Sequence, residues 1–236
     1  MAELKPTASL WERLKQVDTP TVCNAIEVAQ GQRGFNNFTK GTMQASEPQA
    51  SAMVGYARTA KISGNKKPTE PPDEIRKRRM NYFHHMSLGN EPKIAVVEDE
   101  DFPQCVSAWW GEVHTAVHKG LGLSGALTNG VMRDLGDLEP GFPVVAGSIG
   151  PSHAFVHATE IGTKVSIFGL EIKNDDLIHA DRHGALVIPI EVIPTLEAAI
   201  DKLISTEHLI LNPARQPNFN FEKLEKAWSE FEKSRT

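Results

Sequence analysis

The sequence predicts an α/β domain followed by a C-terminal helical extension. Short apolar segments with strand patterning alternate with longer segments whose apolar residues recur at helical spacing. The last part of the chain carries two amphipathic helical patterns and no strand pattern. We expect one domain over residues 1–236, with its core at about 20–190 and the C-terminal helices at about 191–236.

The N-terminal pattern, residues 8–30, predicts two helices. Leu10, Leu14 and Val17 lie on one face of the first, three to four residues apart. Thr19 is a suitable N-cap for the second, with Pro20 at the first helical position, where a missing N–H costs nothing.

Residues 53–62 then alternate as a strand does, and the Pro-, Gly- and Lys-rich stretch 63–72 predicts a loop. Asp73 is expected to cap a helix that runs to Met86. A strand follows at residues 93–98.

Residues 111–119 predict a helix that ends at Gly120 and Gly122. An apolar strand at 126–128 leads through the turn Asn129-Gly130 toward Arg133 and Asp134. The remaining elements are predicted from the same patterns: strands at 144–146, 164–168 and 185–188, and helices at 193–204 and 221–231.

The segment from Gly111 to Asp134 contains the residues best suited to chemistry. A helix that starts near Gly111 presents unpaired N–H groups, and glycine lets an anion approach them closely. Arg133 is the type of residue that grips a carboxylate with two parallel hydrogen bonds. Asp134 is a hard oxygen ligand suited to Mg²⁺ or Mn²⁺. The residues alone allow a site for a metal-chelated 2-oxo acid, and equally a surface ion pair.

Residues 111–114 (GEVH) and 125–134 (GALTNGVMRD), followed by 176–189 (DLIHADRHGALVIP), resemble the two signature blocks of the RraA-like family. The resemblance runs from about residue 19 to residue 189. That family contains the class II 4-hydroxy-4-methyl-2-oxoglutarate aldolases and the regulators of ribonuclease E activity. It implies a three-layer β/β/α swivelling-domain fold that assembles as a homotrimer or a dimer of trimers, with sites between subunits.

The resemblance also assigns roles residue by residue. The backbone grip on the substrate would come from Gly111, Glu112, Val113 and His114, the substrate-binding guanidinium would be Arg133, and the metal ligand would be Asp134. Glu112 stands where the aldolases have an acidic residue, commonly Asp. Because the regulators are the members expected to lack that acid, Glu112 favours an enzyme.

One departure from the family pattern concerns the turn before the second block. The usual Pro-Gly-Asp is replaced by Asn174, Asp175 and Asp176, residues that tolerate left-handed turn geometry.

Three histidine pairs share a spacing of four residues: His114 and His118, His153 and His157, and His179 and His183. Such a spacing on a helix can place two imidazoles on one zinc ion. The alternative for all six histidines is a set of satisfied polar contacts at a subunit interface.

The charge and cysteine content exclude other classes. A net charge of −5 and a sequence pI near 6.0 argue against a nucleic-acid groove or a membrane contact, and the basic run 76–79 is expected to be a solvated helix face. Cys23 and Cys105 fit neither a metal cluster nor a disulfide framework. With no apolar signal core in residues 1–6, we expect a cytoplasmic protein.

Together these features predict a lyase that uses Mg²⁺ or Mn²⁺ to cleave a 4-hydroxy-2-oxo acid by a retro-aldol reaction to pyruvate. Oxaloacetate decarboxylation is expected as a side activity, because both reactions pass through the same enolate. Two alternatives remain: a non-catalytic regulator that binds a ribonuclease, and a zinc hydrolase that uses the paired histidines.

Overall fold

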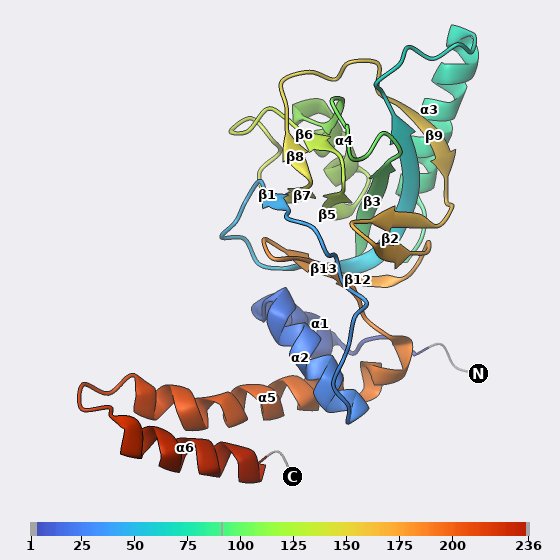
Figure 1. Ribbon diagram of the computed structural model, residues 1–236. Coiled ribbons are helices and arrows are strands. Elements are labelled where there is room, and N and C mark those ends of the chain that lie inside the picture. The colour runs from blue at the N-terminus through green and yellow to red at the C-terminus, as the bar shows by residue number, and fades with distance from the viewer. Residues whose placement is uncertain (1–3, 91, 235–236) are drawn as a thin grey trace.

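The computed structural model describes residues 4–90 and 92–234 and shows a mixed α/β fold (Figure 1). A curled eight-stranded sheet has the order β1-β7-β5-β3-β2-β12-β13, and β9 pairs with β2. Strands β2, β3, β5 and β7 are parallel neighbours, and the other pairings are antiparallel. The strands of this sheet are β1 (Gln44–Ala45), β2 (Met53–Ser63), β3 (Lys93–Asp99), β5 (Leu123–Thr128), β7 (Val144–Ala146), β9 (His157–Ile161), β12 (Leu177–Asp181) and β13 (Gly184–Val187).

Two smaller sheets accompany the central one. A three-stranded parallel sheet joins β4 (Ala108–Trp110), β6 (Val131–Met132) and β8 (Ser148–Ile149), and a hairpin pairs β10 (Val165–Ile167) with β11 (Leu170–Ile172). The helices are α1 (Ala8–Gln16), α2 (Thr19–Gln30), α3 (Pro72–Ser87), α4 (Glu112–Gly120), α5 (Ile193–Ala214) and α6 (Phe221–Ser234), with a 3₁₀ turn at Ile190–Val192.

The β/β/α layering expected from the family resemblance is confirmed. On one face of the central sheet, Ile94 and Val96 of β3 pack with the β10–β11 hairpin. On the other face, Ala95 and Val97 of the same strand pack with residues of α3 and of the small parallel sheet. Alternate residues of a strand point to opposite faces, so β3 belongs to both cores. A third core joins α1, α2 and the first half of α5 beneath β12 and β13.

The predicted elements are present, with two corrections to the helix starts. Asp18, not Thr19, caps α2, because its side chain accepts a hydrogen bond from the Thr21 N–H; Thr19 is already helical. Likewise Pro71 precedes α3, and Asp73 lies in the first turn without making a capping bond. In both cases the helix starts one or two residues earlier than the sequence pattern indicated.

Some strands were not predicted. Strand β4 contains Trp109 and Trp110, and all its residues are buried, so no alternation marks it. Strands β9, β11 and β12 were also missed. The replaced turn does keep left-handed geometry, with Asp175 at φ 67°.

Within the described residues, none of the helices has the length and apolar character needed to span a bilayer. The prediction that the N-terminus lacks a signal core rests partly on residues 1–3, which lie outside the described range.

Candidate functional site

The small parallel sheet brings the two halves of the predicted site together. In the β4–β6 pairing Trp110 lies opposite Met132, so Gly111 and Arg133 leave the sheet side by side. The Arg133 N–H donates to the Trp110 carbonyl at 2.8 Å, which fixes this junction. Helix α4 starts immediately after Gly111. Its first N–H groups therefore lie at the carboxyl edge of a parallel sheet, where α/β proteins commonly bind ligands.

Gly111 leaves room for two charged side chains. A Cβ at this position would lie 2.5 Å from Asp134 Oδ2, closer than real Cβ atoms approach, and 3.0 Å from Arg133 Nε, so both side chains would have to shift. Its φ of −147° is ordinary extended backbone. The absent side chain is what lets both charged groups reach the start of α4.

Asp134 lies against that helix start. Its Oδ2 accepts a hydrogen bond from the Glu112 N–H at 3.2 Å, and a carboxylate there is favoured by the positive end of the helix dipole. Asp134 has a φ of 57°, in the left-handed region that few residues other than glycine adopt. A strained backbone of this kind is frequent at functional sites, and here it directs the carboxylate toward α4.

Arg133 is only partly paired. Its Nε lies 3.7 Å from Asp134 Oδ2, which is an ion-pair distance but too long for a hydrogen bond. That Nε is buried and, among the described residues, has no hydrogen-bond partner. Burying a donor without an acceptor costs free energy. A bound ligand with an acceptor atom near Arg133 Nε would remove that cost.

The side chains of the other predicted site residues do not all point into the site. The Glu112 backbone belongs to the site, but its side chain is exposed, and the Val113 side chain is 67% exposed. The structure therefore brings together Gly111, Arg133, Asp134 and the Glu112 backbone. The side chains of Glu112 and Val113 lie at the solvent-exposed edge of this site, which we call the rim.

His114 faces the protein interior instead. Its ring meets Trp109 edge-to-face with the centroids 4.2 Å apart, and its Nδ1 is buried without a partner among the described residues. Burial lowers the pKa of His114 to about 3, with smaller contributions in the same direction from the neighbouring basic groups of His118, Arg79 and Arg133. The imidazole is therefore neutral at physiological pH.

A buried polar chain behind α4 was not recognised in the sequence. The Trp109 indole donates to Tyr82 Oη at 3.2 Å, and Tyr82 lies 2.7 Å from His118 Nε2. His118 Nδ1 lies 2.6 Å from the His114 carbonyl, which can only accept, so Nδ1 carries the proton and Nε2 accepts from Tyr82. The spacing of His118 from His114 suggested a zinc ligand, and no sequence pattern connected it with Tyr82 or Trp109.

These hydrogen bonds change the interpretation of the first histidine pair. Both nitrogens of His118 are occupied by protein partners, so His114 and His118 do not form a zinc site. Across the described residues, no group of three or more His, Cys, Asp or Glu side chains is arranged to hold a metal ion.

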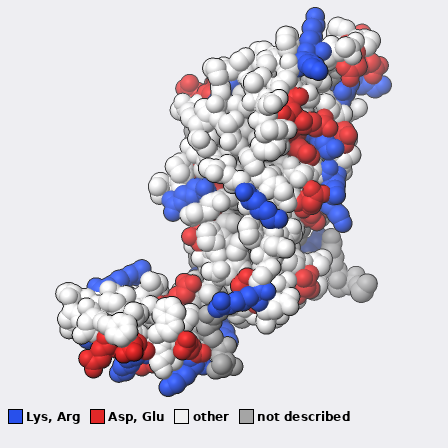
Figure 2. Space-filling view, viewed as in Figure 1, with Lys and Arg blue, Asp and Glu red and all other residues white. Residues whose placement is uncertain are grey.

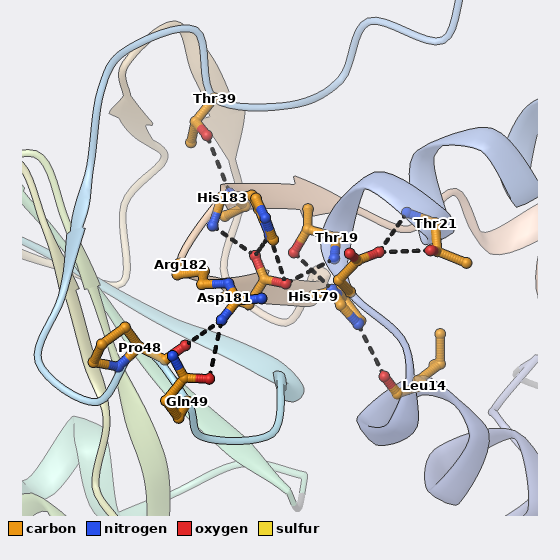
Figure 3. A network of polar contacts seen from close by, with 12 residues as sticks. Leu14, Thr19, Thr21, Thr39, Pro48, Gln49, His179, Asp181, Arg182 and His183 are labelled. Carbon is orange, nitrogen blue, oxygen red and sulfur yellow. Dashed lines mark hydrogen bonds and ion pairs between the residues drawn. The ribbon is translucent and has the colours of Figure 1, made fainter. Parts of the chain in front are cut away.

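Figure 3 shows the third histidine pair in a different setting. His179 is fully buried; its Nε2 donates to the Leu14 carbonyl at 3.0 Å and its Nδ1 accepts from Thr19 Oγ1 at 3.0 Å. Asp181 accepts from the Thr19 N–H and from the His183 N–H and ring. These contacts join α1 and α2 to the β12–β13 hairpin, which is a structural role.

The remaining pair, His153 and His157, makes hydrogen bonds to nearby backbone. His153 and His157 each direct Nδ1 to a carbonyl oxygen one or two residues away, and both are at the surface. Both cysteines are free thiols, and burial raises the pKa of Cys23 to about 11.

Comparison with known proteins agrees with this fold. The profile of the RraA-like family (Aldolase/RraA) matches residues 19–187. No curated protein matches the chain. Among solved structures, an uncharacterized protein from Pseudomonas syringae pv. tomato str. DC3000 has a TM-score of 0.67 at 18% identity, covering 95% of this chain and 99% of the other. Streptomyces coelicolor RraAS2, described as an unusual member of the RNase ES inhibitor RraA family, has a TM-score of 0.64 at 19% identity, covering 90% and 98%. A structure described among novel cellulases from gut-associated microbes has a TM-score of 0.68 at 20% identity, covering 88% and 90%. At these identities the similarities establish the fold.

Proposed function

The chain belongs to the RraA-like family, which contains both aldolases and ribonuclease inhibitors, and from this premise we propose that it is a divalent-metal-dependent lyase. Its reaction is the retro-aldol cleavage of a 4-hydroxy-2-oxo acid to pyruvate, with oxaloacetate decarboxylation as a side activity. The observation that carries the proposal is Arg133 Nε, which lies buried beside Asp134 and the start of α4 and has no hydrogen-bond partner in the part of the chain that the structure describes. An anionic headgroup would satisfy that donor.

The residues fit Mg²⁺ or Mn²⁺ better than zinc. Asp134 is a single carboxylate, and the described residues offer no cluster of three ligating side chains around it. Mg²⁺ commonly binds one or two protein carboxylates and takes its other ligands from water and substrate. Zinc sites need three or four protein ligands, which are not assembled here. Asp134 would hold the ion, and the ion would stabilise negative charge that develops on the substrate keto oxygen.

The substrate carboxylate would bind between the Arg133 guanidinium and the N–H groups of the first turn of α4. Both are positive. The Arg133 backbone is held by its bond to Trp110, and α4 is held by the buried hydrogen bonds of Tyr82 and His118. A site fixed in advance need not reorganise when charge develops, which is the main source of electrostatic catalysis.

Glu112 would move the proton. It is the first residue of α4, next to Arg133 and Asp134 in space, and its side chain is exposed at the rim. In the cleavage direction a base must remove the proton of the 4-hydroxyl group, and the carbanion must later be protonated. Glu112 can serve both steps directly or through one water.

The same family membership underlies the proposed assembly, whereas the compartment follows from the N-terminal sequence pattern. We propose a homotrimer or a dimer of trimers, acting on a small 2-oxo acid in the cytoplasm. The exposed Val113 at the rim would then lie near a neighbouring subunit.

A coupled pyruvate assay tests the function. A panel of 4-hydroxy-2-oxo acids and oxaloacetate is incubated with the protein, with Mg²⁺ and after exhaustive EDTA treatment. The expected result is pyruvate release that needs the metal and is lost in Asp134→Ala. Full activity after EDTA would remove the metal from the proposal. No pyruvate from any substrate, together with binding to a ribonuclease, would assign the chain to the non-catalytic regulators instead.

A further inference from the structure

Asp99 carries a buried carboxyl group that the proposed reaction does not use. It is the last residue of β3 and is 1% exposed. Its Oδ1 accepts a hydrogen bond from the Asp101 N–H at 3.0 Å, but its Oδ2 is buried and has no partner in the described chain. A buried acceptor without a donor costs free energy, and it costs more when it is charged.

Acidic side chains close to Asp99 at the surface are in a different setting. Lys61 lies 3.1 Å from Glu160 and 3.9 Å from Glu100. Figure 2 shows acidic and basic side chains together on the side of the molecule where β9 lies. Water and Lys61 offset the charges of these exposed acids. The Asp99 carboxyl is removed from water, so an ionised Oδ2 would be an uncompensated buried charge.

The titratable groups that act on the Asp99 carboxyl lie on the loop that follows β3, and none of them is a cation: Glu100, Asp101 and Cys105. The adjoining residues of β2 and of the turn after β5 do not titrate: Ile62, Asn129 and Gly130. Burial, reinforced by the two neighbouring acids, raises the pKa of Asp99 to about 6, although the Asp101 N–H and the Cys105 thiol oppose the shift. The charge of this buried group therefore changes close to neutral pH.

Asp99 lies where two segments that carry the candidate site leave the central sheet. The chain runs from Asp99 through a loop into β4 and Gly111, and from Asn129 into β6 and Arg133. The Asn129 side chain joins the two segments: its Oδ1 accepts from the Asp99 N–H at 2.7 Å, and its Nδ2 donates to the Asp99 carbonyl at 3.1 Å. A movement of Asp99 is therefore transmitted to both halves of the site.

The Asp99 carboxyl also packs on the backbone of the second segment. A Cβ on Gly130 would lie 2.9 Å from Asp99 Cβ and 3.0 Å from Oδ2. The Gly130 carbonyl in turn accepts from the N–H groups of Gly147 and Ser148, at the start of β8. A charged Oδ2 can be hydrated only if the loop or the turn moves away from it.

We propose that Asp99 is a pH-controlled joint that regulates the candidate site. When the carboxyl is protonated, the loop 100–107 and the turn 128–130 pack closely on it, and Gly111 and Arg133 keep the positions described above. When the proton is released to solvent, the buried charge favours conformations in which loop and turn separate and water reaches Oδ2. Its effect on catalysis rests on the proposed function, whereas the conformational change does not.

Urea unfolding of the full-length chain at pH 4.5 and pH 7.5 tests the conformational part. The folded pKa is above the value of 3.8 expected for the unfolded chain, so the folded state keeps the proton longer and wild-type stability falls as pH rises between the two values. Asp99→Asn has no such proton. Relative to the wild type, its unfolding constant should fall by about 10-fold or more from pH 4.5 to pH 7.5.

Glu100→Gln is the matched control, because it removes the same charge from the next residue at an exposed position. It should keep the wild-type pH dependence. Parallel pH dependences of the wild type and Asp99→Asn would overturn the proposal.

Hydrogen exchange measured by mass spectrometry locates the movement and needs no variant that might fail to fold. After correction for the intrinsic rate, wild-type peptides from residues 100–112 and 128–134 should exchange about 10-fold or more faster at pH 7.5 than at pH 5. Peptides from α1 and α2 should show no such change. Equal corrected rates at the two pH values would mean that Asp99 lowers stability without moving the site, and would overturn the joint.

The pyruvate assay then tests the regulation. The ratio of kcat/KM in Asp99→Asn to that in the wild type should rise from pH 5 to pH 7.5, because only the wild type loosens, and a constant ratio would overturn the regulatory role. If no substrate is cleaved at any pH, the proposed function fails, and hydrogen exchange still decides whether Asp99 controls the two segments.

Discussion

Buried histidines behind α4 and beneath β12 are held in different ways. In the β12 cluster (Thr19, His179, Asp181 and His183), the buried polar side-chain atoms have partners within the described chain. In the α4 cluster (Tyr82, Trp109, His114 and His118), both ring nitrogens of His118 are hydrogen-bonded, but His114 Nδ1 is buried and has no partner within residues 4–90 and 92–234.

The unpaired atoms extend from the α4 cluster toward the candidate site. Trp110 Nε1 and Arg133 Nε are also buried without hydrogen-bond partners among the described residues. A complete network stabilises the fold, and an incomplete one next to a helix start and an aspartate indicates a place for a ligand. Buried histidines therefore have a structural role in the β12 cluster and border the proposed site in the α4 cluster.

The strongest test of this difference is Arg133→Ala. Because Arg133 is partly unpaired in the free protein, its loss should reduce kcat/KM for oxaloacetate by about 10³-fold and leave the melting temperature nearly unchanged. Steady-state kinetics and a thermal melt measure both. Arg182→Ala is the control, since Arg182 donates hydrogen bonds to the Pro48 carbonyl and to Gln49 beside the β12 cluster, and activity should be retained. Unchanged kinetics in Arg133→Ala would remove Arg133 from the site.

A methyl group at Gly111 should disturb the site without touching a charged residue. In Gly111→Ala the new Cβ displaces Asp134 and Arg133 from the start of α4, and we expect about a 10²-fold loss of kcat/KM. Gly120→Ala, at the other end of α4, meets open space and should be neutral. Equal activity in the two variants would show that the close approach at Gly111 has no catalytic value.

Substitutions in the β12 cluster should lower stability and leave activity unchanged. His179→Phe leaves the Leu14 carbonyl and the Thr19 hydroxyl unpaired in the interior, which should lower the free energy of unfolding by about 2–3 kcal/mol. Urea unfolding measures this, and kcat should stay at the wild-type value. His183→Ala, at an exposed position of the same cluster, should cost under about 1 kcal/mol. A large loss of activity in folded His179→Phe would contradict the structural role.

The sequence indicated that Arg133 lies near the helix start at Gly111. A short strand and a tight turn precede Arg133, and they leave few ways to connect the two positions. The pairing of β4 with β6 confirms that expectation. Strands β4 and β12 were missed because both are buried on both faces and lack alternation.

Other features depend on tertiary contacts that a single sequence does not encode locally. Tyr82 and His118 are 36 residues apart, and only the packing of α3 on α4 makes them partners. For the same reason the spacing of His114 and His118 suggested zinc, while the fold directs one ring nitrogen of His118 to a carbonyl and the other to a hydroxyl. The unpaired state of Arg133 Nε likewise becomes visible only in the assembled site.

The pH dependence of stability gives the smallest expected effect and tests the paired half of the α4 cluster. Burial lowers the pKa of His118 to about 4, so its folded form stays neutral while the unfolded form is protonated below about pH 6.5. The unfolded state then binds more protons, and stability falls as pH drops from about 6.5 toward 4. Between pH 7 and pH 5, His118 should account for about 2 kcal/mol of that loss.

His118→Phe isolates this contribution from the other buried histidines. His85, His114 and His179 also have lowered pKa values, all because of burial, so they keep an acid-dependent loss in every variant. The variant should be less stable than the wild type at pH 7, because the Tyr82 hydroxyl loses its acceptor, and the gap should narrow by about 2 kcal/mol at pH 5. Urea unfolding at the two pH values measures the gap. A gap that stays constant would mean that His118 is not held neutral by its surroundings, and the contrast between the two clusters would then rest on Arg133 and His114 alone.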